Sequence, residues 1–278
     1  MNDIESTYNK SLLLSPASHV KGSFFRKANT IKPSVFIIGA QKGGTTSLLY
    51  QLSQHPAVVK PRQKEIYYFN NTNFYRKGER WYLKQFDPPL RVDQLQVDAT
   101  ANYLESETAP ARLKKFCPEA KIIILLRNPT ERAFSHYKMS VRLGVEKCSF
   151  ENALALEDAR LEYGQQTYVP KYGHNYAFQR LGYRSKGCYH KFVHKWLEVF
   201  KRDQVLILES EAYFKRPKVC FDTVLDFLHL EKGFAIDFAP KKNGDGLKMN
   251  SEIKDKLSNY YRPYNERLFK MIDKTYNW

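Results

Sequence analysis

The sequence predicts a single-domain α/β protein in which helices cover both faces of a parallel sheet. Apolar runs rich in β-branched residues alternate with amphipathic helical patterns along the chain, which is typical of such sheets. One of these runs enters a glycine-rich turn that opens directly into a helical pattern. No internal repeat, linker or low-complexity tract is present, so one domain accounts for the 278 residues.

The apolar runs have the length of buried strands. The first of them follows Pro33 and is apolar at every position, as expected for a strand buried on both faces. The predicted strands cover residues 35–38, 94–97, 121–126 and 204–208. The predicted helices cover residues 45–52, 107–116, 130–142, 189–200, 218–229 and 251–272.

Two segments fall outside this alternation. Residues 143–187 are rich in Gly, Tyr and Gln with few clean periods, so we interpret them as an insertion over the sheet that could serve as the lid of an acceptor site. Residues 1–30 are polar, and we expect them to form a loosely held arm before a domain of residues 31–278.

The chain is basic, with 45 Lys and Arg against 29 Asp and Glu and a net charge of +16. This excess favours an anionic partner such as nucleic acid, an anionic membrane surface or a phosphorylated or sulfated molecule. The first 30 residues lack the features of a signal peptide, and no apolar run is long enough to span a membrane, so we expect a soluble cytoplasmic protein. The cysteines have no metal-ligand spacing, so we expect free, mostly buried thiols and no metal site; they are Cys117, Cys148, Cys188 and Cys220.

Residues 39–46 form the glycine-rich turn between the first strand and the first helix. Glycines allow backbone N–H groups to point inward, and the helix N-terminus adds partial positive charge. The candidate anion-binding residues are Gln41, Lys42, Gly43, Gly44, Thr45 and Thr46. The Walker pattern requires a lysine where this chain has Thr45, which disfavours a nucleotide kinase or ATPase. A glycine-rich turn without a ligand is the plainer alternative.

A second anion site is predicted where the strand of residues 121–126 ends. Arg127 follows this strand, Pro129 opens the next helix and Ser135 lies on that helix, so a guanidinium and a hydroxyl can converge on one phosphate. Arg132 could pair with a carboxylate or contact the same phosphate. Taken alone, Arg127 is explained better by a salt bridge. With the glycine turn nearby, the two sites favour a ligand with anionic groups at both ends.

Several segments together resemble the sulfotransferases that use 3′-phosphoadenosine-5′-phosphosulfate (PAPS). Residues 36–48 resemble the 5′-phosphosulfate loop of that family, and residues 126–137 resemble its 3′-phosphate motif. Further matches follow in the expected order, at residues 55–56, 64–69, 78–82, 99–103 and 260–265. The likeness runs from about residue 33 to the end, and is strongest to bacterial members and to the sulfotransferase domain of heparan-sulfate enzymes. It implies a P-loop-like parallel sheet, PAPS as the donor, adenosine 3′,5′-bisphosphate (PAP) as the product, and no metal.

The resemblance also implies catalytic roles. Lys42 would stabilise the oxygen that departs from sulfur, and Glu65 aligns with the glutamate that serves as general base in the glycan branch. A surface ion pair of Glu65 with Lys64 or Lys60 is the alternative. His136 is a second candidate base, although its place beside the phosphate-motif serine favours a position on the helix surface.

The chain departs from the family pattern in two places, at a catalytic lysine position and in a basic loop. Some glycan-branch members carry a catalytic lysine where this chain has Ala99. The preceding residue, Asp98, could assist the base or bind a cationic acceptor. The family also places a basic loop over the 3′-phosphate, and Lys241, Lys242 and Asn243 match it loosely, although a solvated turn explains them equally well.

The acceptor site is expected between residues 66–82 and residues 143–187, which are both rich in aromatic side chains. The candidate acceptor-binding residues are Tyr67, Trp81, Asp98, Tyr183, Ser185 and Tyr189. We expect transfer to a hydroxyl or amine of a carbohydrate; a saxitoxin-like guanidinium alkaloid or a phenol is the alternative. A nucleic-acid-binding protein is disfavoured because the basic residues are dispersed along the chain. The oligomeric state is left open.

Overall fold

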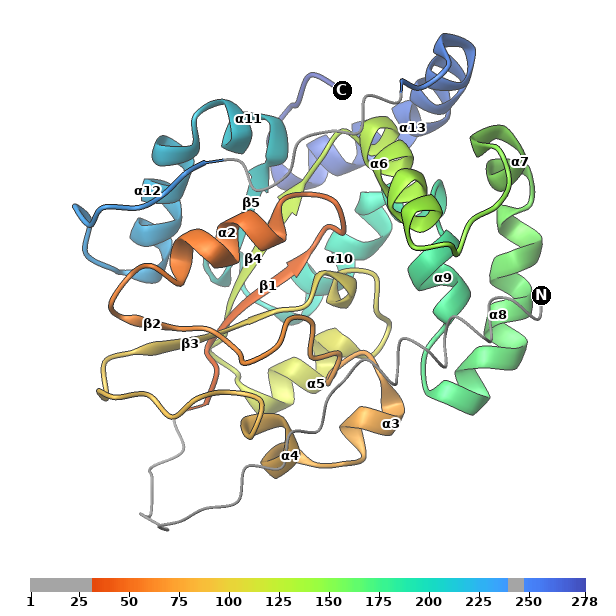
Figure 1. Cartoon of the computed structure of the whole chain (residues 1–278). Helices are drawn as coiled ribbons and strands as arrows, with labels where there is room; N and C mark the ends of the chain where they lie inside the picture. The colour runs from red at the N-terminus through yellow and green to blue at the C-terminus, as the bar shows by residue number, and fades with distance from the viewer. Residues whose placement is uncertain (1–31, 240–247) are drawn as a thin grey trace.

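The computed structural model describes residues 32–239 and 248–278, and these residues form one parallel sheet of five strands (Figure 1). The strand order is β2-β3-β1-β4-β5, and every pair of neighbouring strands is parallel. The strands are β1 (Val35–Gly39), β2 (Val58–Val59), β3 (Leu95–Ala99), β4 (Lys121–Leu126) and β5 (Val205–Glu209). The predicted α/β class with a parallel sheet is confirmed.

The continuous apolar runs are explained by burial on both faces of the sheet. In β1, Phe36 and Ile38 face one hydrophobic core, whereas Val35 and Ile37 face the other. The same alternation continues in β4, whose last five residues are all buried. A strand covered on both sides has no polar face, so it shows no alternation of apolar and polar residues.

Helices cover both faces of the sheet. One core is closed by helices α2 (Thr45–Leu52), α11 (Ser210–Lys215) and α12 (Pro217–Leu228). The other is closed by α5 (Ala109–Phe116), α10 (Tyr189–Val199) and α13 (Ser251–Ile272). The helix α6 (Pro129–Arg142) follows β4 and contacts α13. Each predicted helix is present, with ends that differ by no more than a few residues.

Three short elements near the sheet edge were not predicted. The strand β2 has only two residues, too few for a periodicity to be visible. The helices α3 (Thr72–Tyr75) and α4 (Glu79–Leu83) are single turns, and they owe their conformation to the aromatic cluster against which they pack.

The segment of residues 143–187, for which the sequence predicted no secondary structure, is largely helical. It contains α7 (Phe150–Ala155), α8 (Glu157–Tyr172), α9 (Tyr176–Leu181) and the 3₁₀ turn η2 (Ser185–Gly187). The helix α8 carries an internal proline and a glycine, which obscure its pattern. That glycine, Gly164, lets α8 approach α9 closely, because a Cβ there would lie 2.6 Å from the Cβ of Ala177. Tertiary contact therefore overrides the weak local preference.

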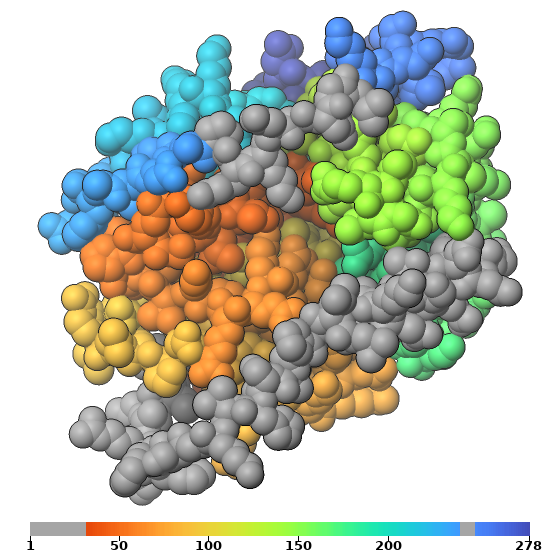
Figure 2. All heavy atoms as spheres, in the orientation of Figure 1, coloured from red at the N-terminus to blue at the C-terminus, as the bar shows by residue number. Residues whose placement is uncertain are grey.

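The sheet brings three strand ends to one edge. The glycine turn follows β1, the 3₁₀ turn η1 (Ala101–Tyr103) follows β3, and α6 follows β4. In Figure 2 the surface is hollowed at this edge, between the orange segment that contains the glycine turn and the yellow-green segment of α6. Among the described helices, none is both long enough and apolar enough to cross a membrane. The predicted arm of residues 1–30 lies outside the described residues.

Candidate active site

The glycine turn has the geometry of an anion cradle. Lys42 and Gly44 adopt positive φ angles of 71° and 104°, and Gly44 is the N-cap of α2. No side chain caps this helix, so the N–H groups of its first turn have no acceptor within the helix. A Cβ at Gly43 would lie 2.4 Å from the carbonyl oxygen of Leu125 and 2.9 Å from that of Ala40, both backbone atoms. Only glycine fits there, and the geometry favours an anion-binding turn over a turn without a ligand.

Lys64 lies over the start of α2. Its ammonium donates hydrogen bonds to the Thr45 and Thr46 hydroxyl oxygens, both at 2.9 Å. Because these hydroxyls accept from Lys64, their own protons remain available to an anion. Lys64 therefore belongs to the glycine turn, a role that sequence reasoning missed when it treated this residue only as an ion-pair partner.

The second predicted anion site lies directly beside the glycine turn. The Arg127 guanidinium donates to the Lys42 carbonyl oxygen at 3.3 Å, because β1 and β4 are neighbouring strands. The carbonyl oxygen of Arg127 accepts from the Tyr189 hydroxyl at 2.9 Å. Ser135 lies further along α6 and is partly exposed. The side chain of Asn128 caps α6 by accepting from two backbone N–H groups of its first turn.

Arg132 and His136 are buried beneath this site rather than exposed on the helix surface. Both are 0% exposed, so the expected surface position of His136 is wrong. Within the described part of the chain, Arg132 donates to the carbonyl oxygen of Tyr183 and not to a carboxylate. Burial, together with the charges of Lys186, Arg132 and Lys42, lowers the pKa of His136 well below its usual value. A buried imidazole of low basicity does not suit the role of base.

Glu65 faces the glycine turn and is mostly buried. Its side chain is 17% exposed, and one carboxylate oxygen accepts from the Asn102 amide at 3.2 Å. Lys64 lies 3.8 Å from the other oxygen, so an ion pair exists, but it is long and it is not on the open surface. Tyr67 lies within hydrogen-bonding reach of the same carboxylate, and burial raises the pKa of its phenol.

Lys186 links this carboxylate to the glycine turn. The side chain is 1% exposed, and its ammonium donates to Gln41 Oε1 at 2.8 Å and to Asn102 Oδ1 at 2.7 Å. Asn102 in turn donates to Glu65. Gln41, Glu65, Asn102 and Lys186, which come from four separate segments, thus form one polar network. Sequence reasoning did not assign a role to Lys186 or to Asn102.

Asp98 does not face the hollow. Its carboxylate is 0% exposed and accepts hydrogen bonds from the hydroxyls of Tyr82, Thr100 and Tyr103, at 2.8, 2.8 and 3.0 Å. Burial outweighs these donors and raises the pKa of Asp98 to about 6. The predicted contact of Asp98 with an acceptor does not fit this enclosed position. Ala99, which ends β3, is buried beside it.

Three other candidate acceptor residues are engaged within the fold. The Tyr183 hydroxyl donates to Glu146, and the Ser185 hydroxyl donates to Glu157. Tyr189 is 1% exposed and holds the strand end at Arg127. Each of these three hydroxyls donates a hydrogen bond to another residue of the protein, so the structure does not support a contact of these side chains with an acceptor.

Tyr67 and Trp81 are the remaining acceptor candidates. The Tyr67 hydroxyl accepts from Gln179 of α9 at 2.9 Å, and Trp81 packs in an aromatic cluster with Phe74 beneath Lys77. The backbone of residue 72 also donates to that of residue 173. The segments of residues 66–82 and 143–187 are therefore in contact beside Glu65, as the expected acceptor site requires.

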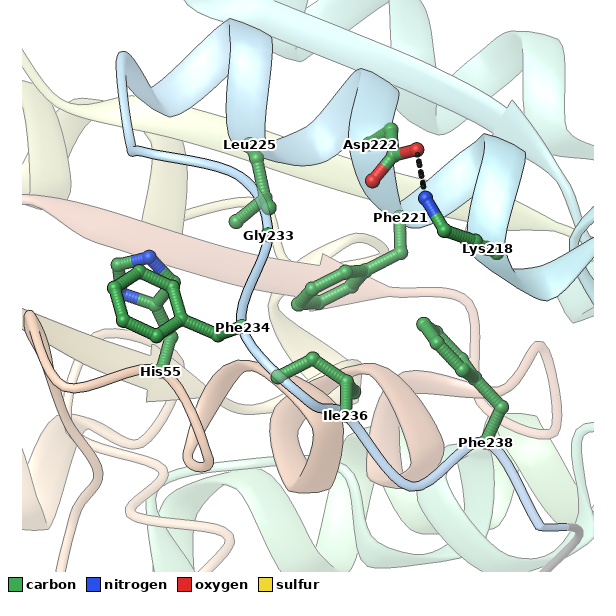
Figure 3. Close-up of a pocket in the computed structure, with 9 residues that line it drawn as sticks. All are labelled: His55, Lys218, Phe221, Asp222, Leu225, Gly233, Phe234, Ile236 and Phe238. Carbon is green, nitrogen blue, oxygen red and sulfur yellow. Dashed lines mark hydrogen bonds and ion pairs between the residues drawn. The ribbon is translucent and has the colours of Figure 1, made fainter.

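Lys241, Lys242 and Asn243 lie outside the described residues. A cavity of about 110 Å³ lies beside His55 and Phe234, near the C-terminal end of α2 (Figure 3). The ring nitrogens of His55 are hydrogen-bonded to the backbone of Ala57 and Glu231, and Phe234 and Lys218 in the lining are exposed, so the cavity lies near the surface.

All four cysteines lie within the described residues. The four thiols are free, but only Cys188 is buried, so the expectation of mostly buried thiols is wrong. No cluster of three or more metal-ligating side chains occurs in residues 32–239 and 248–278.

A profile of the sulfotransferase domain matches residues 32–238, which is most of the chain. The chain belongs to the sulfotransferase family. Both the predicted family and the predicted enzyme class are confirmed by this match. A sulfotransferase from Alicyclobacillus acidocaldarius superposes with a TM-score of 0.75 at 28% identity, over 88% of this chain and 98% of that one. This neighbour also supports the fold class.

Two relatives place this sulfotransferase domain within longer proteins. The membrane-associated sulfotransferase kil1 of Dictyostelium discoideum is 26% identical over 88% of this chain. The bifunctional heparan sulfate N-deacetylase/N-sulfotransferase 4 of Mus musculus is 31% identical over 86% of it. The chain spans 66% of the first relative and 30% of the second, less than two thirds of each.

Proposed function

We propose that this sulfotransferase transfers the sulfuryl group of PAPS to a hydroxyl or amine of a carbohydrate. The observation that carries the proposal is the contact between its two anion sites, in which Arg127 donates to the backbone of Lys42. A ligand with anionic groups on both its 5′ and 3′ sides matches two such sites at neighbouring strand ends.

The chemistry of the residues at the strand ends fits PAPS. The uncapped first turn of α2, the hydroxyls of Thr45 and Thr46 and the ammonium of Lys42 would hold the 5′-phosphosulfate. Arg127 and Ser135 would hold the 3′-phosphate. When bound, the donor supplies an activated sulfuryl group.

Two residues around that group would have different roles, one in charge stabilisation and the other in proton transfer. Lys42 would stabilise the negative charge that develops on the departing phosphate, as a fixed cation does for phosphoryl transfer. Glu65 would accept the proton of the acceptor hydroxyl or amine at a carboxylate oxygen. Asn102 holds that carboxylate in place, and Lys64 balances its charge.

A carbohydrate acceptor is supported by the heparan sulfate relative and by the aromatic rings beside Glu65. Tyr67 and Gln179 come from the two segments that would enclose the acceptor, and the lid role of residues 143–187 stays a prediction. The small-molecule alternative, a guanidinium alkaloid or a phenol, is distinguished by experiment. The cytoplasmic location also stays a prediction.

Binding calorimetry with PAP, ATP and duplex DNA tests the donor assignment. We expect PAP to bind and ATP to bind much more weakly, because the turn lacks the Walker lysine. Duplex DNA should also bind weakly, because the basic residues are dispersed along the chain. Binding of ATP without binding of PAP would contradict the proposal. Sulfur-35-labelled PAPS offered with heparan sulfate, 4-nitrophenol and a guanidinium compound then identifies the acceptor class, and label in the phenol or guanidinium alone rejects a carbohydrate.

Two substitutions test the catalytic roles in the same transfer assay. We expect Glu65→Gln to lower turnover by about 10²–10⁴-fold and Lys42→Ala by about 10²–10³-fold. Lys60→Ala is the matched control, because Lys60 is an exposed lysine on the same segment. The melting temperature of each variant should stay close to that of the wild type. Near-wild-type turnover in Glu65→Gln would reject Glu65 as the base.

A further inference from the structure

Lys186 is a buried cation with every donor engaged. It lies in η2, and its ammonium contacts Gln41, Asn102 and, at 3.4 Å, the carboxylate of Glu105. An ammonium has three N–H groups and no acceptor, so these three oxygens exhaust its hydrogen-bonding capacity. Burial lowers the pKa of Lys186, whereas the neighbouring Glu105 raises it.

The ammonium determines how two amides are oriented. Because it can only donate, Gln41 and Asn102 must both turn their oxygen atoms toward it. The NH₂ group of Asn102 then points away from Lys186 and donates to Glu65 Oε2. If Asn102 rotated by half a turn, its oxygen would face the carboxylate and its NH₂ group would face the ammonium, and both contacts would be repulsive.

The fold holds Lys186 inward by close packing of the next residue. A Cβ at Gly187 would lie 2.6 Å from the ring of Tyr261 in α13, so η2 seats directly against that ring. The Tyr261 hydroxyl also donates to the carbonyl oxygen of Arg184 at 2.8 Å. With η2 seated in this way, the Lys186 side chain extends to Gln41 in the glycine turn and to Asn102.

Stability alone is a poor explanation for this arrangement. Burying a charge is unfavourable unless its pairing is close, and apolar residues often replace buried ion pairs without loss. Here the nearest carboxylate is at 3.4 Å, and Arg132 lies near enough to oppose the charge. The two short bonds go instead to the amides that border the site.

We propose that Lys186 is a positioning residue for sulfuryl transfer, which fixes the Asn102 amide so that it holds the Glu65 carboxylate and fixes the Gln41 amide within the glycine turn. The role of Lys186 in catalysis rests on the proposed function, in which Glu65 is the base. The effect of Lys186 on the Glu65 carboxylate does not depend on that function.

The charged and titratable groups shown to interact with Glu65 include Lys64, Tyr67, Asp98 and Lys186. Replacing Lys186 leaves the other three side chains in the sequence. A change in the protonation of Glu65 therefore reports the loss of the Lys186 charge and of the Asn102 N–H that it orients.

The test follows the carbon-13 carboxyl signal of Glu65 as a function of pH, identified by its absence in Glu65→Gln. We expect Lys186→Met to move the midpoint upward by about one pH unit, because a carboxylate that loses a nearby cation and a donor is protonated more easily. Lys186→Arg keeps the cation and its donors and should restore the midpoint. Lys195→Met is the matched control, since Lys195 pairs with Glu107 at the surface.

Asn102→Ala keeps the test valid if Lys186→Met does not fold. It removes the N–H donor to Glu65 and leaves Lys186 with Gln41 and Glu105. We expect an upward shift here too, and adding Lys186→Met should give a further shift smaller than in the wild-type background, because only the Lys186 charge is then left to lose. A wild-type midpoint in Asn102→Ala, or in a folded Lys186→Met, would overturn the proposal.

The transfer assay separates this proposal from the proposed function. We expect Lys186→Met to lower kcat by about tenfold and to shift the acid limb of kcat/KM toward higher pH, since less Glu65 is ionised at a given pH. If Glu65→Gln retains turnover while the carboxyl midpoint still shifts, the base assignment fails and the positioning of Glu65 by Lys186 stands. A lower kcat with unchanged midpoint and acid limb would mean a structural role only.

Discussion

The two sides of the active site are built in different ways. The glycine turn takes its ligand-facing groups from consecutive residues, 41–46, between β1 and α2. The network around Glu65 takes Gln41, Asn102 and Lys186 from segments that are far apart in the chain. The first side is a local motif, whereas the second exists only when the sheet and η2 are assembled. The two should therefore respond differently to substitution.

The largest effect is expected at Asp98, which lies outside the hollow and, like the Glu65 network, depends on contacts between separate segments. Its folded-state pKa of about 6 lies above the ordinary value of 3.8, so the folded state binds more protons between these values. The contribution of Asp98 is thus fully present below pH 4 and is lost as the pH rises through 6, by about 3 kcal/mol. Urea unfolding of the wild type and Asp98→Asn from pH 4 to 7 measures this loss.

The difference between those two stability curves isolates Asp98 from other titrating groups. It should shrink as the pH rises, because the wild type loses stability as the Asp98 carboxyl gives up its proton, whereas the asparagine side chain has no proton to lose in this range. Asp93→Asn, at an exposed site, provides the control. If the difference in stability stays constant from pH 4 to 7, burial does not raise the pKa of the Asp98 carboxyl.

An intermediate effect is expected within the glycine turn. Gly43→Ala would force a Cβ against the Leu125 and Ala40 carbonyl oxygens, which are backbone atoms, so it should destabilise the protein by about 1–3 kcal/mol and weaken PAP binding. Thermal unfolding and calorimetry measure both. Gly144→Ala separates the causes, since that site has a φ of 69° and no atom within 4 Å. Gly144→Ala should lower the free energy of unfolding by about 1 kcal/mol through backbone strain and leave PAP binding unchanged.

The smallest effect is expected at Asn128, which is again encoded locally. Its side chain accepts from the backbone N–H groups of Thr130 and Glu131 at the start of α6. Asn128→Ala should lower the free energy of unfolding by about 1 kcal/mol, whereas Asn128→Ser, which keeps a capping oxygen, should change it by a few tenths. Equal losses in the two variants would show that the cap contributes little.

Most of the sheet could be predicted because buried parallel strands leave a plain signature. The strands β1 and β4 are apolar at almost every position, and the longer helices between them, α2 and α5, have recognisable periods. The strand β2 and the helices of residues 143–187 could not be predicted. Two residues carry no period, and α8 is held by its contact with α9 rather than by a strong pattern of its own.

The site shows the same division. The proximity of Arg127 to Lys42 follows from the topology, since each residue comes shortly after one of two adjacent parallel strands. The burial of His136 and Asp98 does not, and both were expected to be more accessible than they are. A side chain on a helix or at a strand end has no mark in the sequence that tells whether another element will cover it.

The sequence by itself determined the fold class, the glycine turn and the family, because each depends on consecutive residues whose spacing is set by backbone geometry. Only the tertiary structure decided which polar groups meet. Lys186 reaches Gln41 and Asn102 because Gly187 lets η2 pack against α13, and Asp98 is enclosed because three hydroxyls converge on it. Contacts between distant segments depend on how elements pack, and local patterns do not record that packing.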